Sequence, residues 1–298
     1  MSVFFECTYR GRRHVGLDKP EPGAPLVLYP LAEETDLRRT ALAAGRDRAA
    51  LVAELTSGGG RVTVPDFETG FVRFRPPLMP ASAGDAMVSG FMQTHNVKVG
   101  ADTQSQPNWF LKGMGDCLKV PGDDLAVPSS AVALCEEAEI VLVYVTDDAG
   151  EPRYTGYTFG NDLTDIGRFK RHQGHLSYAK LCDAAVAPWL FLDEPPQRVT
   201  GRVTVERDGG PGWQGGFTTG TKALHYGLGG MMSELFSYGT LRRPGLVHYV
   251  FIGADRSSFH GGYRMTDQDR VTLEFTSHGV TLSNRIHWPR PVTAAVEG

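Results

Sequence analysis

Residues 137–146 read EAEIVLVYVT, an apolar run rich in β-branched residues that begins with two glutamates. β-Branched residues favour the extended backbone of a strand. The run ends at residues 147–150, DDAG, which are typical of a tight turn. The chain from Tyr154 onward is therefore expected to return as the second strand of a β-hairpin.

Glu137 and Glu139 lie two residues apart at the start of this strand. Alternate side chains of a strand point to the same face, so the two carboxylates are expected about 7 Å apart along the backbone. Carboxylates held this close repel each other, and a shared proton or a bound cation is the usual relief. A solvated acidic strand end is the alternative that this pair leaves open.

A third carboxylate follows at the end of the returning strand. Residues 156–162 read GYTFGND, and pairing of the two strands would bring Asp162 close to Glu137 and Glu139. Three carboxylates without a histidine or cysteine form a site of hard oxygen ligands. Such a site suits Mg²⁺, Mn²⁺ or Ca²⁺ better than zinc.

The rest of the chain consists of short apolar runs separated by Gly, Pro, Asp and Asn, which is typical of a β-rich protein. Two segments, 162–179 and 223–236, are expected to be helical. Further strands are expected at residues 202–206, 246–252 and 271–275.

Residues 1–78 are expected to form a small N-terminal α/β module. Apolar residues recur at helical spacing between Asp36 and Leu55, which predicts one amphipathic helix. Prolines at positions 76, 77 and 80 cannot donate to a sheet and mark a linker. Residues 79–298 are then predicted to form the main domain.

The composition excludes several classes of protein. The 298 residues include 30 Lys and Arg against 34 Asp and Glu, and no long basic run offers a surface for nucleic acid. No apolar stretch approaches the roughly 20 residues that span a membrane, and no secretory signal is evident. The four cysteines are far apart, which favours reduced thiols. We expect a cytoplasmic protein without nucleic-acid or membrane partners.

These residues together resemble the signature of the fumarylacetoacetate hydrolase superfamily. That signature is a Glu-x-Glu-Leu strand, a Gly-Tyr-x-x-x-Asn-Asp segment and a downstream lysine, and residues 137–140, 156–162 and Lys180 are similar to it. Residues 93–95 and 107–113 resemble, in addition, the branch of 2-keto-3-deoxy sugar acid dehydratases. The resemblance covers roughly residues 75 to 285.

The resemblance implies an α+β, β-rich fold, in which mixed sheets form a roll or sandwich of the fumarylacetoacetase C-terminal type. It also implies a homodimer or a dimer of dimers with one divalent ion per site, Mg²⁺ or alternatively Mn²⁺ or Ca²⁺. By position, Glu137, Glu139 and Asp162 are the expected metal ligands. Lys180 is expected to act in catalysis near the metal, and His95 to be an acid/base on a segment that closes over the site.

Lys112, Arg168 and Thr218 are the candidate substrate-binding residues. Two departures from the family pattern bear on the reaction. Hydrolases and decarboxylases of this superfamily commonly place a glutamate shortly after the lid histidine, whereas residues 96–98 here read NVK. Where many relatives carry hydroxyl residues late in the chain, residues 252–255 read IGAD.

The expected chemistry is stabilisation of an enolate by a divalent ion that a 2-oxo acid chelates. The first hypothesis is a dehydratase of a 2-keto-3-deoxy acid-like substrate, a small carboxylate. A C–C hydrolase or decarboxylase of a 1,3-dicarbonyl compound is the second, although the missing glutamate disfavours it. A tautomerase or specialised-metabolite enzyme, and a metal-stabilised binding protein without activity, remain as alternatives.

Overall fold

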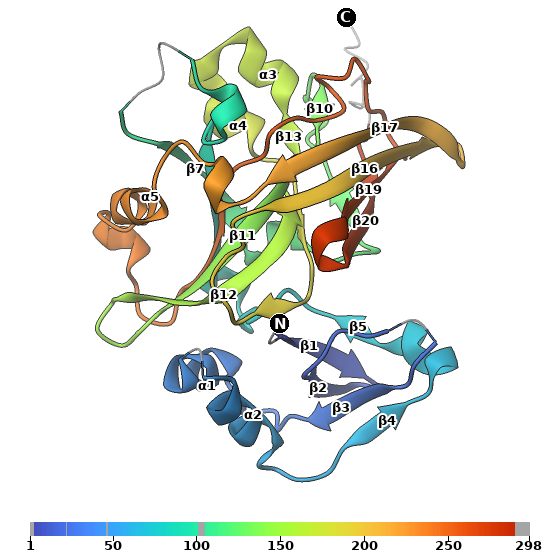
Figure 1. Cartoon of the computed structure of the whole chain (residues 1–298), viewed down its shortest axis with the longest axis vertical. Helices are drawn as coiled ribbons and strands as arrows, with labels where there is room; N and C mark the ends of the chain where they lie inside the picture. Colours follow the sequence, from blue (N-terminus) through green and yellow to red (C-terminus); the bar gives the residue numbers. More distant parts are fainter. Residues whose placement is uncertain (1–2, 22, 46, 101–104, 290–298) are drawn as a thin grey trace, which may run out of the picture.

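The computed structural model describes residues 3–21, 23–45, 47–100 and 105–289 of the chain. In these ranges the strands form a sheet of thirteen strands, a sheet of five and a pair. Figure 1 shows a long hairpin near the centre, the five-stranded sheet beside it and the N-terminal strands at one end. The predicted α+β, β-rich fold class is confirmed.

The hairpin predicted from residues 137–146 belongs to the large sheet. β11 (Ala138–Thr146) and β12 (Pro152–Asn161) pair antiparallel, with a bulge between Val143 and Tyr144. Every side chain of β11 except that of Tyr144 is buried. Coverage of both faces explains why the sequence of this strand is almost continuously apolar.

On one side of the hairpin the sheet continues with both parallel and antiparallel pairs. β18 (Val247–Phe251) pairs antiparallel with β11, and β6 (Ala86–Met92) runs parallel to β18. β7 (Asn108–Met114) pairs antiparallel with β6 and ends the order of strands. The sheet is therefore mixed, as expected.

The five-stranded sheet packs against the hairpin. The ring centroid of Phe275 lies 4.6 Å from that of Phe159 on β12 and 5.1 Å from that of Phe217 in its own sheet. The largest core thus lies between the two sheets. The strands of this sheet are, in order, β17 (Gly210–Thr219), β16 (Val199–Arg207), β19 (Arg270–Phe275), β20 (Val280–His287) and β9 (Asp124–Ala126).

The N-terminal strands join the large sheet through β1 (Val3–Tyr9), whose first residues pair with β15 (Leu190–Phe191). The ring of Phe5 lies edge-on to that of Trp189, with centroids 5.2 Å apart. The predicted domain boundary at residue 78 stays a prediction. The other strands of this part are β2 (Arg12–Gly16), β3 (Leu26–Pro30), β4 (Val62–Val64) and β5 (Arg73–Phe74).

The single helix expected between Asp36 and Leu55 is wrong, because the chain forms two helices there. α1 (Leu37–Ala44) ends at Gly45, whose φ of 58° is readily adopted by glycine. α2 (Arg48–Thr56) begins after Asp47, whose side chain accepts hydrogen bonds from the backbone N–H groups of Ala49 and Ala50. This internal N-cap interrupts a pattern that otherwise keeps helical spacing.

The helix expected over residues 162–179 is also wrong. This segment contains β13 (Thr164–Asp165), α3 (Ile166–Arg171), a short 3₁₀ turn and α4 (Leu176–Ala179). β13 pairs with β10 (Leu134–Cys135), which keeps the chain extended immediately after Asp162.

The helix expected over residues 223–236 is shorter than predicted, α5 (Leu228–Leu235). None of the helices in the described ranges is long and apolar enough to cross a membrane. The remaining short strands, β8 (Leu118–Lys119) and β14 (Ala184–Val186), pair with each other in parallel.

Candidate metal centre and pocket

The open end of the hairpin brings three carboxylates together. Glu137 immediately precedes β11 and Asp162 immediately follows β12, and the N–H of Asp162 donates to the carbonyl of Glu137 at 3.0 Å. Glu139 pairs with Gly160 across the hairpin. One carboxylate oxygen from each of Glu137, Glu139 and Asp162 lies within 4.8 Å of the others. The structure thus brings together the three residues predicted as metal ligands.

Two buried lysines donate hydrogen bonds to this cluster. Lys180 donates to Oε2 of Glu137 at 2.8 Å and also to Asp162, and Lys112 donates to Oδ1 of Asp162 at 2.8 Å. Both lysine side chains are at most 1% exposed. Burial alone lowers the pKa of Lys180, but the charges of Asp162 and Glu137 outweigh it and raise that pKa. Through these hydrogen bonds both lysines fix the orientation of the acids.

Glu139 has a different environment from the other two acids. Its Oε2 accepts a hydrogen bond from the backbone N–H of Gly253 at 2.6 Å. Burial, and then repulsion from Asp162 and Glu137, raise its pKa well above the ordinary value. For Glu137, in contrast, the charges of Lys180 and Lys98 outweigh burial and lower the pKa.

This donor set fits a divalent cation. Three carboxylates converge without a histidine or cysteine in the group, which matches the hard oxygen ligands of Mg²⁺, Mn²⁺ and Ca²⁺. The repulsion at Glu139 is the kind that a bound cation relieves. Glu137, Glu139 and Asp162 are the residues that could hold such an ion.

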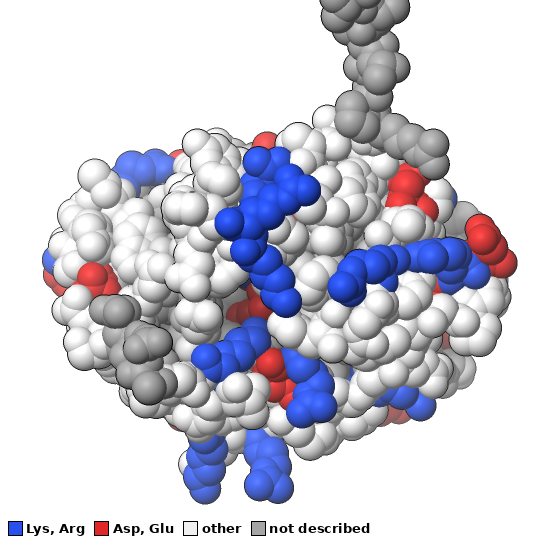
Figure 2. All heavy atoms as spheres, turned by 90° about the horizontal axis from the view of Figure 1, so that it is seen from above, with Lys and Arg blue, Asp and Glu red and all other residues white. Residues whose placement is uncertain are grey.

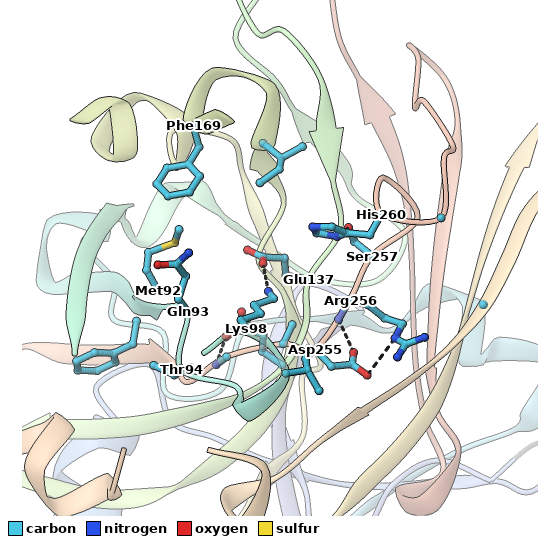
Figure 3. A pocket seen from close by; sticks show the side chains of 18 of the residues that line it. Met92, Gln93, Thr94, Lys98, Glu137, Phe169, Asp255, Arg256, Ser257 and His260 are labelled. Carbon is cyan, nitrogen blue, oxygen red and sulfur yellow. Dashed lines mark hydrogen bonds and ion pairs between the residues drawn. The ribbon is translucent and has the colours of Figure 1, made fainter. Parts of the chain in front are cut away.

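A cavity of about 630 Å³ opens beside the cluster, and both Glu137 and Glu139 line it. Its other walls come from residues 91–94, 97 and 98, from α3, from β17 and from residues 253–257, 260 and 261. Figure 3 shows Phe169 and Met92 on one side of this cavity, His260 and Arg256 on the other, and Glu137 between them. Figure 2 shows acidic atoms in a hollow of one face, with lysine and arginine side chains around it. The cavity therefore combines an acidic patch with a basic surround.

Lys98 is a residue of this site that the sequence analysis did not assign. It lies on the 3₁₀ turn Asn96–Lys98, and its Nζ is 3.0 Å from Oε1 of Glu137. Its side chain is 22% exposed and lines the cavity. No local motif marks Lys98, because only the fold brings this turn to the start of β11.

The structure does not place the predicted acid/base His95 on the wall of the cavity. Its imidazole is buried, and Nδ1 accepts a hydrogen bond from the N–H of Val97 at 3.3 Å. Thr94, Val97 and Lys98 line the cavity while His95 does not, and the imidazole instead holds the start of the covering turn through its hydrogen bond with Val97. Burial lowers its pKa.

His260 is the histidine that lines the cavity. Its Nδ1 lies 2.9 Å from Oγ of Ser257, another residue of the wall. Burial, followed by the charges of Lys98 and Lys170, lowers its pKa. Sequence reasoning missed His260 because it follows no motif and lies on a loop far along the chain from the acids.

The three residues predicted for substrate binding are not among the described residues that line the cavity. Lys112 is buried against Asp162, as described above. Arg168 donates to Asp165 at 3.3 Å and to the carbonyl of Ser130 at 2.6 Å, and so fixes the start of α3. Thr218 donates through its backbone N–H and its hydroxyl to Asp255, at 2.9 and 3.3 Å.

Asp255, the partner of Thr218, does line the cavity. It belongs to residues 252–255, which read IGAD and carry no hydroxyl group. A carboxylate here repels an anionic group of a ligand, so the wall near Asp255 is unsuited to a substrate carboxylate. The basic residues on the wall, Lys98, Lys170 and Arg256, are the alternative partners for such a group.

The chain matches no protein-family model and no curated protein sequence. It does match solved structures over almost its whole length. The apo form of 2-keto-3-deoxy-D-arabinonate dehydratase is 16% identical, with a TM-score of 0.70 over 97% of this chain and 99% of that chain. The same enzyme complexed with magnesium and 2,5-dioxopentanoate is 17% identical, with a TM-score of 0.67 over 97% and 99%.

A third similar structure is 2-hydroxyhepta-2,4-diene-1,7-dioate isomerase from Mycobacterium marinum. It is 18% identical, with a TM-score of 0.61 over 96% of this chain and 98% of that chain. At these identities the likeness is one of fold. The fold implied by the resemblance to the fumarylacetoacetate hydrolase superfamily is thereby confirmed.

Proposed function

We propose that this chain is a divalent-metal-dependent lyase, a dehydratase that acts on a small 2-oxo acid resembling a 2-keto-3-deoxy acid. The observation that carries the proposal is the meeting of Glu137, Glu139 and Asp162 beside a cavity with basic walls. Mg²⁺, or alternatively Mn²⁺ or Ca²⁺, would be held by these three acids. The similar dehydratase structure that is complexed with magnesium and 2,5-dioxopentanoate supports this choice of metal and substrate class.

A bound divalent ion would polarise the oxo group of the substrate and stabilise the negative charge of an enolate. The protein supplies the orientation of the acids. Lys180 and Lys112 donate to Asp162 from the buried side, which leaves the cavity side of the cluster for the substrate. Because Lys180 donates to both Glu137 and Asp162, and Lys112 donates to Asp162 and to the carbonyl of Leu163, we assign both lysines to positioning.

A proton must also reach the leaving hydroxyl if water is eliminated. His260 lines the cavity, and its Nδ1 is held by Ser257, which leaves Nε2 for the substrate. A histidine exchanges protons near neutral pH more readily than the other wall residues. We therefore propose His260 as the acid/base, in the role that the sequence analysis assigned to His95.

The turn after His95 argues against C–C hydrolysis. A hydrolase needs a base that activates water, and this turn carries Lys98 instead of a glutamate. Lys98 donates to Glu137 at 3.0 Å, and an ammonium group that donates does not accept a proton from water. A tautomerase is the second candidate, because one similar structure is an isomerase.

The test is a screen of 2-oxo and 1,3-dioxo acids with added Mg²⁺ or Mn²⁺, with products identified by mass. Loss of one water from a β-hydroxylated 2-oxo acid is the expected result, and it should disappear in excess chelator. An unchanged mass with a new chromophore would favour the tautomerase. Gain of water or loss of carbon dioxide would overturn the dehydratase proposal in favour of hydrolysis or decarboxylation.

A further inference from the structure

Lys98 differs from the other two lysines of the cluster in the exposure of its side chain. Lys112 and Lys180 are at most 1% exposed and contact the acids from the buried side. Lys98 is 22% exposed and reaches Glu137 from the covering turn. Of the three, it is the lysine whose amino group can leave the acids and remain in the cavity.

The carboxylate of Glu137 is occupied on both oxygens. Oε2 accepts from Lys180 at 2.8 Å and Oε1 accepts from Lys98 at 3.0 Å. A divalent ion bound to Glu137 would come close to the ammonium of Lys98, and two cations at such a distance repel each other. Since the contact of Lys180 with Glu137 is buried, the contact of Lys98 with Glu137 is the one that can break when the ion binds.

An anionic ligand would offer Lys98 a new partner. The wall residue Asp255 already accepts from Thr218 and from the N–H of Arg256 at 2.6 Å, so it is satisfied without Lys98. The carboxylate of a substrate next to the cluster would lie in reach of the flexible lysine stem. Lysine is a mobile point charge that suits such an exchange.

We propose that Lys98 exchanges partners during the catalytic cycle. Its ammonium pairs with the carboxylate of Glu137 in the metal-free protein. It leaves this carboxylate when the divalent ion binds there, and then pairs with the carboxylate of the bound substrate. This inference rests on the proposed function, because it assumes an anionic substrate at the metal. It gives Lys98 opposite effects on two ligands: it weakens binding of the ion and strengthens binding of the anion.

The test measures the two affinities separately by calorimetry, with Mn²⁺ alone and then with oxalate at saturating Mn²⁺. Lys98→Met should bind Mn²⁺ several-fold more tightly, because the competing charge is gone. The same variant should bind oxalate about tenfold more weakly, as expected for loss of one partly buried charge pair. Lys98→Arg, which keeps the charge, should retain the native oxalate affinity.

Lys222→Met is the matched control. Lys222 is exposed on the 3₁₀ turn Thr221–Ala223 and is not among the described residues that line the cavity. Its loss should change both affinities less than twofold. A melting curve for each variant, recorded without metal, verifies that the fold is intact.

The outcomes separate this inference from the proposed function. Weaker Mn²⁺ binding by Lys98→Met, or unchanged affinities for both ligands, would overturn the exchange, whatever the substrate screen finds. If the wild type binds no Mn²⁺ but Lys98→Met does, competition between Lys98 and the ion for Glu137 is supported. If neither protein binds Mn²⁺, the exchange is overturned. If the screen finds no dehydration but Lys98→Met still binds Mn²⁺ more tightly and oxalate more weakly, the dehydratase proposal is overturned and the partner exchange is supported.

Discussion

At the scale of single residues, Glu139 is the most informative acid of the cluster. Lys180 and Lys112 contact the other buried acid, Asp162, whereas Glu139 accepts from the N–H of Gly253. A glutamine side chain keeps an oxygen for that hydrogen bond and removes the charge that a cation needs. Glu139→Gln should therefore fold normally and lose metal binding.

We expect at least a tenfold loss of Mn²⁺ affinity in Glu139→Gln, since one of three charged ligands is removed. The unfolding temperature of the metal-free variant should equal or exceed that of the wild type, because repulsion with Asp162 and Glu137 is relieved. A Mn²⁺ titration and a thermal melt measure these effects. Native Mn²⁺ affinity in the variant would place the ion elsewhere.

A comparison of two histidines tests the assignment of the acid/base. His260→Gln should lower kcat on the substrate found by the screen by about 100-fold or more, the usual contribution of general acid–base catalysis. Its Mn²⁺ affinity should change less than twofold, since no ligand is touched. If His95→Gln loses turnover while His260→Gln keeps it, the original sequence prediction is restored.

The residues of the site differ in how far the sequence could predict them. Glu137 and Glu139 follow from the period of a strand, and Asp162 follows from the pairing of one hairpin. Lys98 and His260 lie on separate loops that only tertiary packing brings to the same cavity. Arg168 and Thr218 do not line the cavity but donate hydrogen bonds to Asp165 and Asp255, which no local pattern indicates.

At the scale of elements, strands were predicted better than helices. The hairpin strands are long, apolar and bounded by turn residues, so their sequence pattern predicts strands without ambiguity. The helix expected over residues 162–179 failed because β13 pairs with β10, a contact between segments about 30 residues apart. The helix between Asp36 and Leu55 failed because Gly45 and Asp47 end one helix and start another within a continuous apolar pattern.

β18 carries a titratable group that should make stability depend on pH. His248 is completely buried, with its ring 5.0 Å from that of Phe236. Burial lowers its pKa to about 4. In the unfolded chain the pKa is near 6.5, so between these values the unfolded state binds more protons, and stability falls as the pH falls.

The loss from this histidine should reach roughly 3 kcal/mol between pH 6.5 and pH 4. Urea unfolding across this range measures it, with His248→Gln as the variant that lacks the titrating group. The difference in unfolding free energy between the two proteins should shrink as the pH falls. A difference that stays constant across the range would show that His248 does not titrate as its burial requires.

At the scale of the whole molecule, the edge of the large sheet bears on the proposed homodimer or dimer of dimers. β7 ends the order of strands, and α4 contacts it. Exposed apolar side chains gather here: Leu111 of β7 is 43% exposed, and Tyr178 and Leu181 are 59% and 55% exposed. An edge strand flanked by exposed apolar groups favours association with another copy of the chain.

Leu181→Asp should weaken this association, because a charge would be buried in the contact. Light scattering after size exclusion should give a multiple of the 32.5 kDa chain for the wild type and a smaller mass for the variant. Phe71→Asp is the matched control, since Phe71 is 67% exposed and lies among the N-terminal elements. Because the three expected metal ligands, Glu137, Glu139 and Asp162, come together within one chain, Leu181→Asp should keep its Mn²⁺ affinity even as the assembly dissociates. Equal dissociation by both variants, or a wild type of single-chain mass, would refute an interface at β7 and α4.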